Sequence, residues 1–82
     1  MEIIIPPSIQ KKLAKIGHND IPKVKHKLSQ LQANTLAGKP LKGEYAGYYS
    51  LRAWPLRIVY EFDPKNQTIN ILDIDYRGQV YK

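Results

Sequence analysis

The chain has 82 residues, and its 13 Lys or Arg residues outnumber its seven Asp or Glu residues, which gives a formal net charge of +6. This length suffices for one hydrophobic core, so the sequence predicts a single domain over residues 1–82. The chain has no cysteine and only two histidines. Disulfides, thiolate metal sites and a cysteine nucleophile are therefore excluded, and we expect neither a bound metal nor a cofactor.

The positive charge favours polyanionic partners: RNA, DNA, the ribosome or an acidic protein. The alternative is a basic domain whose charge serves only solubility. No apolar run approaches the roughly 20 residues that a membrane-spanning helix requires. The N-terminal residues also lack the basic region and cleavage site of a signal peptide. The sequence therefore predicts a soluble cytoplasmic protein with no membrane partner.

The N-terminal part of the chain predicts a short strand and then a helical hairpin. Residues 2–5 read as a strand that ends at two prolines, because proline cannot donate to a β-ladder. Ser8 is placed to cap a helix that reaches about Ile16. Asp20 is placed to cap a second helix, whose apolar stripe repeats with helical spacing. The lysines beside these stripes form either a solvated face or a surface that lies against RNA; they are Lys11, Lys12, Lys15, Lys23, Lys25 and Lys27.

The remainder predicts a loop over residues 34–44 and three strands, at 45–53, 56–62 and 68–76. A turn at Trp54-Pro55 separates the first two of these strands, and a polar turn over residues 63–67 separates the second from the third. The apolar pattern of the third strand shifts in phase, which predicts a bulge or burial on both faces.

The expected fold is α+β in the order β-α-α-β-β-β, with the helical hairpin packed on one face of a small, mostly antiparallel, twisted sheet. Side chains alternate along the second strand, so Ile58 and Arg57 point to opposite faces. If the helices cover the Ile58 face, the face that carries Arg57 is either open or forms the wall of a groove.

Four segments, in order, carry a resemblance to a known family. They are Lys39-Pro-Leu-Lys-Gly43, Gly47-Tyr-Tyr-Ser-Leu-Arg52, Leu56-Arg-Ile-Val-Tyr60 and Asp75-Tyr-Arg-Gly-Gln-Val-Tyr81. Together they resemble the central signature and the C-terminal ending of RelE/ParE toxins, and the likeness covers nearly the whole chain. The resemblance implies a microbial-RNase-like fold and the toxin of a type II toxin–antitoxin system.

For the RelE branch, the resemblance implies a ribosome-dependent, metal-independent mRNA endonuclease that inhibits translation. The ribose 2′-OH attacks the adjacent phosphorus and leaves a 2′,3′-cyclic phosphate. For the ParE branch it implies an inhibitor of DNA gyrase, and a third possibility is an inactive module that only binds antitoxin. The implied partners are mRNA in the ribosomal A site and an acidic, partly disordered antitoxin, so that DNA is contacted only through the antitoxin complex.

The family motifs imply catalytic roles for Arg57, Arg77 and Tyr81. A guanidinium suits the charge that develops on phosphoryl oxygens, because its planar fork can pair two oxygens. Tyr81 could stack on a base, or act as an acid or base after a pKa shift. The alternatives are a surface salt bridge of Arg57 to Glu44 or Glu61, and a C-terminal tyrosine packed against the sheet.

Further positions are candidates for RNA binding. Trp54 could stack on a base, meet the antitoxin or pack over the sheet edge. The sequence departs from the family at Tyr48 and Ser50, where the ribosome-dependent members carry lysines, so the general base has no assignment. The basic residues expected to track the phosphate backbone are Lys39, Lys42, Arg52 and Lys82.

Overall fold

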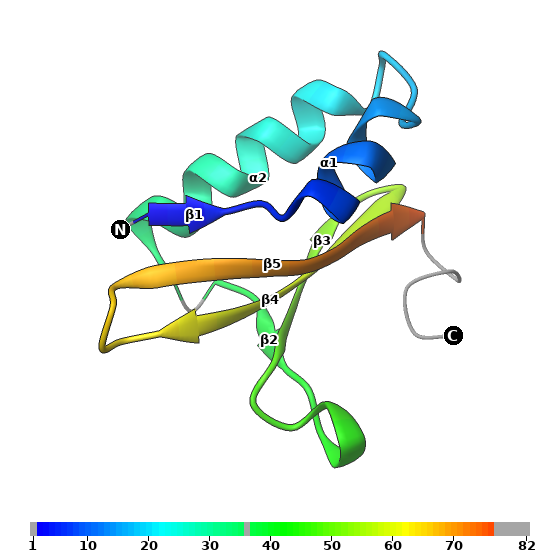
Figure 1. Ribbon diagram of the computed structural model, residues 1–82. Helices are drawn as coiled ribbons and strands as arrows, with labels where there is room; N and C mark the ends of the chain where they lie inside the picture. Colours follow the sequence, from blue (N-terminus) through cyan, green and yellow to red (C-terminus); the bar gives the residue numbers. More distant parts are fainter. Residues whose placement is uncertain (1, 36, 77–82) are drawn as a thin grey trace.

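The computed structural model describes residues 2–35 and 37–76. Its strands form a five-stranded sheet in the order β1-β5-β4-β3-β2, and the two helices lie together on one side of it (Figure 1). In chain order the elements are β1 (Glu2–Ile4), α1 (Pro7–Ala14), α2 (Ile21–Ala33), β2 (Lys39–Pro40), the 3₁₀ helix η1 (Gly43–Tyr45), β3 (Tyr49–Ala53), β4 (Leu56–Asp63) and β5 (Thr68–Tyr76).

The predicted α+β fold, with a helical hairpin on one face of a mostly antiparallel sheet, is confirmed. Strands β2 to β5 pair in antiparallel fashion, whereas β1 runs parallel to β5. Two details differ from the prediction. The expected loop over residues 34–44 contains the short strand β2, and residues 45–48 lie in η1 and a turn, so that β3 begins only at Tyr49.

The phase shift in the third predicted strand is a β-bulge. Val59 pairs with Asp73 but the next residue, Tyr60, pairs with Ile71, so Leu72 is the additional residue on β5. The bulge allows Ile71 and Ile74 to face the same core although they are three positions apart. The prediction of a bulge is therefore confirmed.

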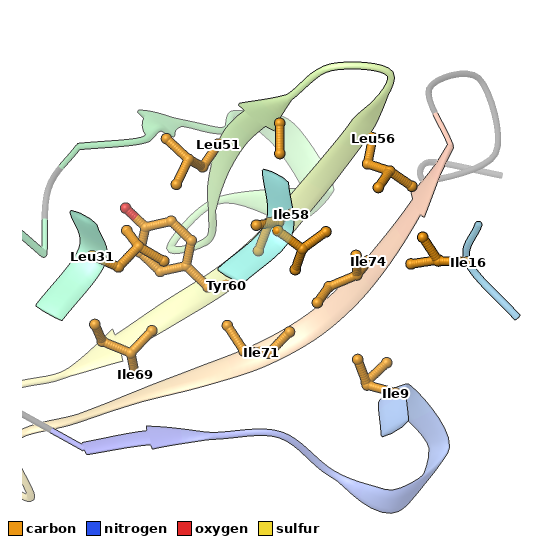
Figure 2. Close-up of a cluster of buried hydrophobic side chains, with 12 residues drawn as sticks. Ile9, Ile16, Leu31, Leu51, Leu56, Ile58, Tyr60, Ile69, Ile71 and Ile74 are labelled. Carbon is orange, nitrogen blue, oxygen red and sulfur yellow. The ribbon is translucent and has the colours of Figure 1, made fainter. Parts of the chain in front are cut away.

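The core lies between the helices and one face of the sheet (Figure 2). Val24 and Leu31 of α2 are almost completely buried, and Ile9 of α1 is 5% exposed. Each buried side chain of this size contributes about 1.5–3 kcal/mol of transfer free energy. The sheet side chains that meet the helices include Leu51, Leu56, Ile58, Tyr60, Ile69, Ile71 and Ile74.

The helix ends differ in part from the sequence prediction. Ser8 lies inside α1, whose N-cap is Pro6, so the prediction that Ser8 caps this helix is wrong; Pro7 is suited to the first helical turn. Asp20 does occupy the N-cap of α2, but its carboxylate makes no capping bond. It instead binds Lys23 Nζ at 3.2 Å and accepts a hydrogen bond from the Tyr76 hydroxyl at 3.2 Å. This contact ties the turn between the helices to the end of β5.

Neither helix could cross a membrane: in the part of the chain that the structure describes, no helix is long and apolar enough. The longer helix, α2, has 13 residues.

Candidate functional site

A hollow of about 430 Å³ opens beside α2, the α2–β2 connection and strands β3 and β4. Among the described residues, four cations and no carboxylate line it. A concentration of positive charge in one concave surface raises the local concentration of anions. The lining side chains are Lys27, Ala37, Lys39, Ser50, Leu51, Arg52 and Arg57.

Strand pairing places the two arginines of the hollow next to each other. Arg52 of β3 lies directly opposite Arg57 of β4, so both side chains are on the same face of the sheet. This face is opposite to the one where Leu51 and Ile58 enter the core. Like charges directly opposite each other destabilise a sheet, and an anion held between them would offset that repulsion. Of the two arrangements expected for the Arg57 face, an open surface or the wall of a groove, the structure has the second.

Tyr60 holds the connection that leads into β2. Its hydroxyl donates a hydrogen bond to the Thr35 carbonyl at 2.8 Å and accepts one from the Gly38 N–H at 3.1 Å. The ring is fully buried and stacks on Tyr49, with centroids 5.4 Å apart. Burial raises the pKa of the Tyr60 hydroxyl, which therefore stays a proton donor at neutral pH.

Gly38 is needed where this connection passes the sheet. A Cβ at this position would lie 2.9 Å from the Ser50 carbonyl oxygen and 2.9 Å from the Tyr60 ring. Such contacts are too short for any side chain, so only glycine allows so close an approach. The approach brings Lys39, which pairs with Ser50 across β2 and β3, to the rim of the hollow.

Lys27 of α2 is the site residue that the sequence prediction did not single out. It was assigned to the basic helical surface, yet it is half-buried and lines the hollow, whereas Lys25 is exposed. The available signal was its spacing: Lys27 lies three residues after Val24 and four before Leu31, at the border of the apolar stripe. A lysine in that position can bury its stem and present its amine beside the sheet.

The structure brings together Lys39, Arg52 and Arg57 of the predicted site residues. Lys42 is exposed at the start of η1 and is not among the side chains that line the hollow. Trp54 lies in the β3–β4 turn with 58% of its surface exposed, next to a cis peptide bond with Pro55. The remaining predicted residues, Arg77, Tyr81 and Lys82, lie outside the described residues, and their roles stay predictions.

A pair of carboxylates lies on β5 on the same face as Arg57. Asp75 is directly opposite Arg57, and Asp73 is directly opposite Val59. Lys12 of α1 reaches both carboxylates, with Nζ 2.6 Å from Asp73 Oδ1 and 3.4 Å from Asp75 Oδ2. The hydrogen bond to Asp73, assisted by the charges of both carboxylates, raises the pKa of Lys12 despite some opposing desolvation.

The chain matches a known family over nearly its full length. Residues 3–81 match the family described as the ParE toxin of type II toxin–antitoxin system, parDE. The chain belongs to the ParE toxin family. The predicted resemblance to RelE/ParE toxins is thereby confirmed.

Individual ParE-family relatives agree with this assignment. Toxin RelG of Mycobacterium tuberculosis is 40% identical over 45 residues, which cover 55% of this chain and 52% of RelG, so the match spans about half of that curated relative. A chain in the toxin–antitoxin complex RelBE2 of Mycobacterium tuberculosis is 26% identical, with a TM-score of 0.69 over 93% of this chain and 96% of that one. The YoeB/ParE toxin of Agrobacterium tumefaciens is 21% identical and shares the fold, with a TM-score of 0.80 over 94% of this chain and 99% of that one.

Proposed function

We propose that this ParE-family protein is the toxin of a type II toxin–antitoxin system and that it cleaves mRNA in the ribosomal A site, using the cationic hollow to bind the phosphate backbone. The observation that carries the proposal is the convergence of four cations from α2, β2, β3 and β4 on one concave surface. At about 430 Å³, the hollow is in the size range of small-molecule sites, so it has room for a nucleotide.

Each cation has a distinct part in this proposal. The guanidinium of Arg57 pairs the non-bridging oxygens of the scissile phosphate as negative charge develops on them, and Arg52 on the neighbouring strand supports it. Lys27 and Lys39 neutralise the flanking phosphates from the helix side and the β2 side of the hollow. The 2′-OH then loses its proton as its oxygen attacks the phosphorus in line, and the bond from phosphorus to the 5′-oxygen of the next nucleotide breaks. The products are a 2′,3′-cyclic phosphate and a 5′-hydroxyl, whose oxygen takes up a proton.

Proton transfer requires other groups. A guanidinium or ammonium group carries N–H donors and no acceptor, so the four cations serve as donors to phosphate oxygens and another group must take the proton of the 2′-OH. Tyr81 or a group of the ribosome itself takes this proton. Dependence on the ribosome follows directly if the ribosome supplies the base.

The proposed protein partner is an acidic antitoxin. The relative from Mycobacterium tuberculosis was solved as a toxin–antitoxin complex, which supports a comparable complex here. A chain with a net charge of +6 attracts an acidic segment, and such a segment can fold on binding. In this proposal DNA is contacted only through the antitoxin complex.

The family match to ParE supports one alternative function, inhibition of DNA gyrase. In that case the cationic hollow binds an acidic surface of the target or its DNA, and the protein makes no cut in RNA.

The deciding experiment is primer extension on cellular mRNA after brief induction of the protein. Wild type and the control Lys65→Ala, which removes an exposed lysine in the β4–β5 turn, should produce in-frame cuts within translated regions. Arg57→Ala should lose them, because removing one donor to the transition state typically costs about 2.7–4 kcal/mol of the barrier. Arg57→Lys keeps the charge but not the planar fork, and should recover only part of the activity.

The other outcomes each identify a different function. Toxicity with DNA damage and intact mRNA would replace the nuclease with a gyrase inhibitor. Unimpeded growth would leave a module that only binds antitoxin.

A further inference from the structure

An ion-paired cluster lies next to the cationic hollow, on the other side of Arg57. Its members are Lys12 of α1 and the carboxylates of Asp73 and Asp75 of β5. The side chains of Asp73 and Asp75 are 22% and 30% exposed, and that of Lys12 is 43% exposed. The shorter contact, 2.6 Å between Lys12 Nζ and Asp73 Oδ1, is a charge-assisted hydrogen bond.

Strand register connects this cluster to the hollow. Arg52 is opposite Arg57 across β3 and β4, and Arg57 is opposite Asp75 across β4 and β5. The row therefore contains two arginines and then a carboxylate, and Lys12 contacts that carboxylate at 3.4 Å. Asp75 thus has a cation as neighbour on each side: Lys12 from the helix and Arg57 from the strand.

A carboxylate beside Arg57 competes with a phosphate for the same guanidinium. Carboxylates and phosphates both form two-pronged hydrogen bonds with arginine, so whichever is closer and less well satisfied binds it. Two unneutralised carboxylates would also repel an incoming phosphate. Lys12 lessens both effects because it satisfies Asp73 and Asp75 from the α1 side.

We propose that Lys12 is a positioning residue of the anion site: by binding Asp73 and Asp75 it keeps the Arg57 guanidinium committed to a phosphate group in the hollow. The proposal rests on the proposed function of the hollow as a phosphate site. Lys12 is not among the side chains that line the hollow, so its effect is transmitted through Asp75.

The test measures the binding of inorganic phosphate and of a short 2′-O-methyl RNA, which cannot be cleaved, by calorimetry and NMR titration. The variant is Lys12→Met and its matched control is Lys11→Met, which removes the same charge from an exposed position of the same helix. Lys12→Met should weaken binding by about fivefold or more, the lower end of coupling between sites that share a charged network. Lys11→Met should change binding less than about twofold through net charge alone.

A second substitution separates positioning from a structural role. In Lys12→Met with Asp75→Asn, the competing carboxylate is gone, so affinity should return toward that of wild type. Asp75→Asn alone should tighten binding more than Glu2→Gln, which removes an exposed carboxylate on β1. If Lys12→Met proves unstable in a thermal melt, Lys12→Gln takes its place in both the single and the double variant.

The unfavourable results can be told apart. Equal affinities of the Lys12→Met and Lys11→Met variants, or no recovery in the double variant, would overturn the role of Lys12 while leaving the anion site in place. Phosphate and RNA binding that is absent, or unaffected by Arg57→Ala, would overturn the anion site itself, together with the role of Lys12 that depends on it.

Discussion

Tyr60→Phe removes one oxygen from the fully buried side chain that holds the α2–β2 connection against the sheet. The ring, its stacking on Tyr49 and its core volume are retained. The Thr35 carbonyl loses a donor at 2.8 Å and the Gly38 N–H loses an acceptor at 3.1 Å. The substitution therefore tests those two hydrogen bonds without creating a large cavity.

The expected loss of stability follows from the burial of these two groups. A buried polar group left without a partner costs about 1–3 kcal/mol, and Thr35 and Gly38 are only half-buried, so water can replace part of each bond. We therefore expect a decrease of about 2 kcal/mol in the free energy of unfolding. For a domain of this size, that decrease corresponds to a Tm lower by about 8–16 °C.

Urea unfolding measures the loss of stability, and a phosphate titration measures the effect on the hollow. Phosphate should bind the Tyr60→Phe variant about threefold more weakly, because Ala37 of the loosened connection and Lys39 of β2, which follows it, line the hollow. Tyr49→Phe is the matched control, since it keeps the stacked rings and both hydrogen bonds of Tyr60. Equal stability of Tyr60→Phe and wild type would refute the claim that this hydroxyl anchors the connection.

Three other predictions concern Gly38, Tyr60 and Lys27. Gly38→Ala should lower the free energy of unfolding by about 1–3 kcal/mol in urea, because its Cβ would lie 2.9 Å from backbone and ring atoms. The Cβ of the control Gly17→Ala meets nothing closer than 3.9 Å, so similar losses for both variants would contradict this. Above pH 10.0 the free energy of unfolding should fall, because an unfolded tyrosine ionises at its ordinary pKa while the pKa of folded Tyr60 is raised. In the Tyr60→Phe variant, the free energy of unfolding should depend less on pH in this range. Lys27→Met should reduce the magnitude of the slope of log affinity for single-stranded RNA against log salt concentration by about 0.7. Lys25→Met, at an exposed position of the same helix, should leave that slope nearly unchanged. Equal slopes for both variants would remove Lys27 from the site.

Local sequence patterns predicted the helices and strands whose apolar residues repeat with helical or alternating spacing. The alternation in β4 placed Ile58 in the core and Arg57 on the opposite face, and the phase shift near Leu72 indicated the bulge. Strand β2 could not be predicted in this way. It has only two residues, one of them Pro40, and it exists because Lys39 pairs with Ser50 of a later strand.

The sequence predicted only those site residues that lie on strands where polar and apolar side chains alternate clearly. Arg52 and Arg57 belong to one hairpin, so local sequence already places them side by side. Lys27 and Lys12 come from the helices, and whether they meet the sheet depends on how the helical hairpin docks. The contact between Lys12 and Asp73 joins residues 61 positions apart, and no spacing rule relates them.

The parallel pairing of β1 with β5 joins the two most distant strands of the described chain. Residue 2 is opposite residue 68, whereas β3, β4 and β5 are joined by short turns and α1 is followed closely by α2. Closing so long a stretch of chain costs more entropy than closing a hairpin, and it cannot begin until β5 has been made. The contact of Lys12 with β5 has the same requirement, so the row from Arg52 to Asp75 is completed only when the last described strand is in place.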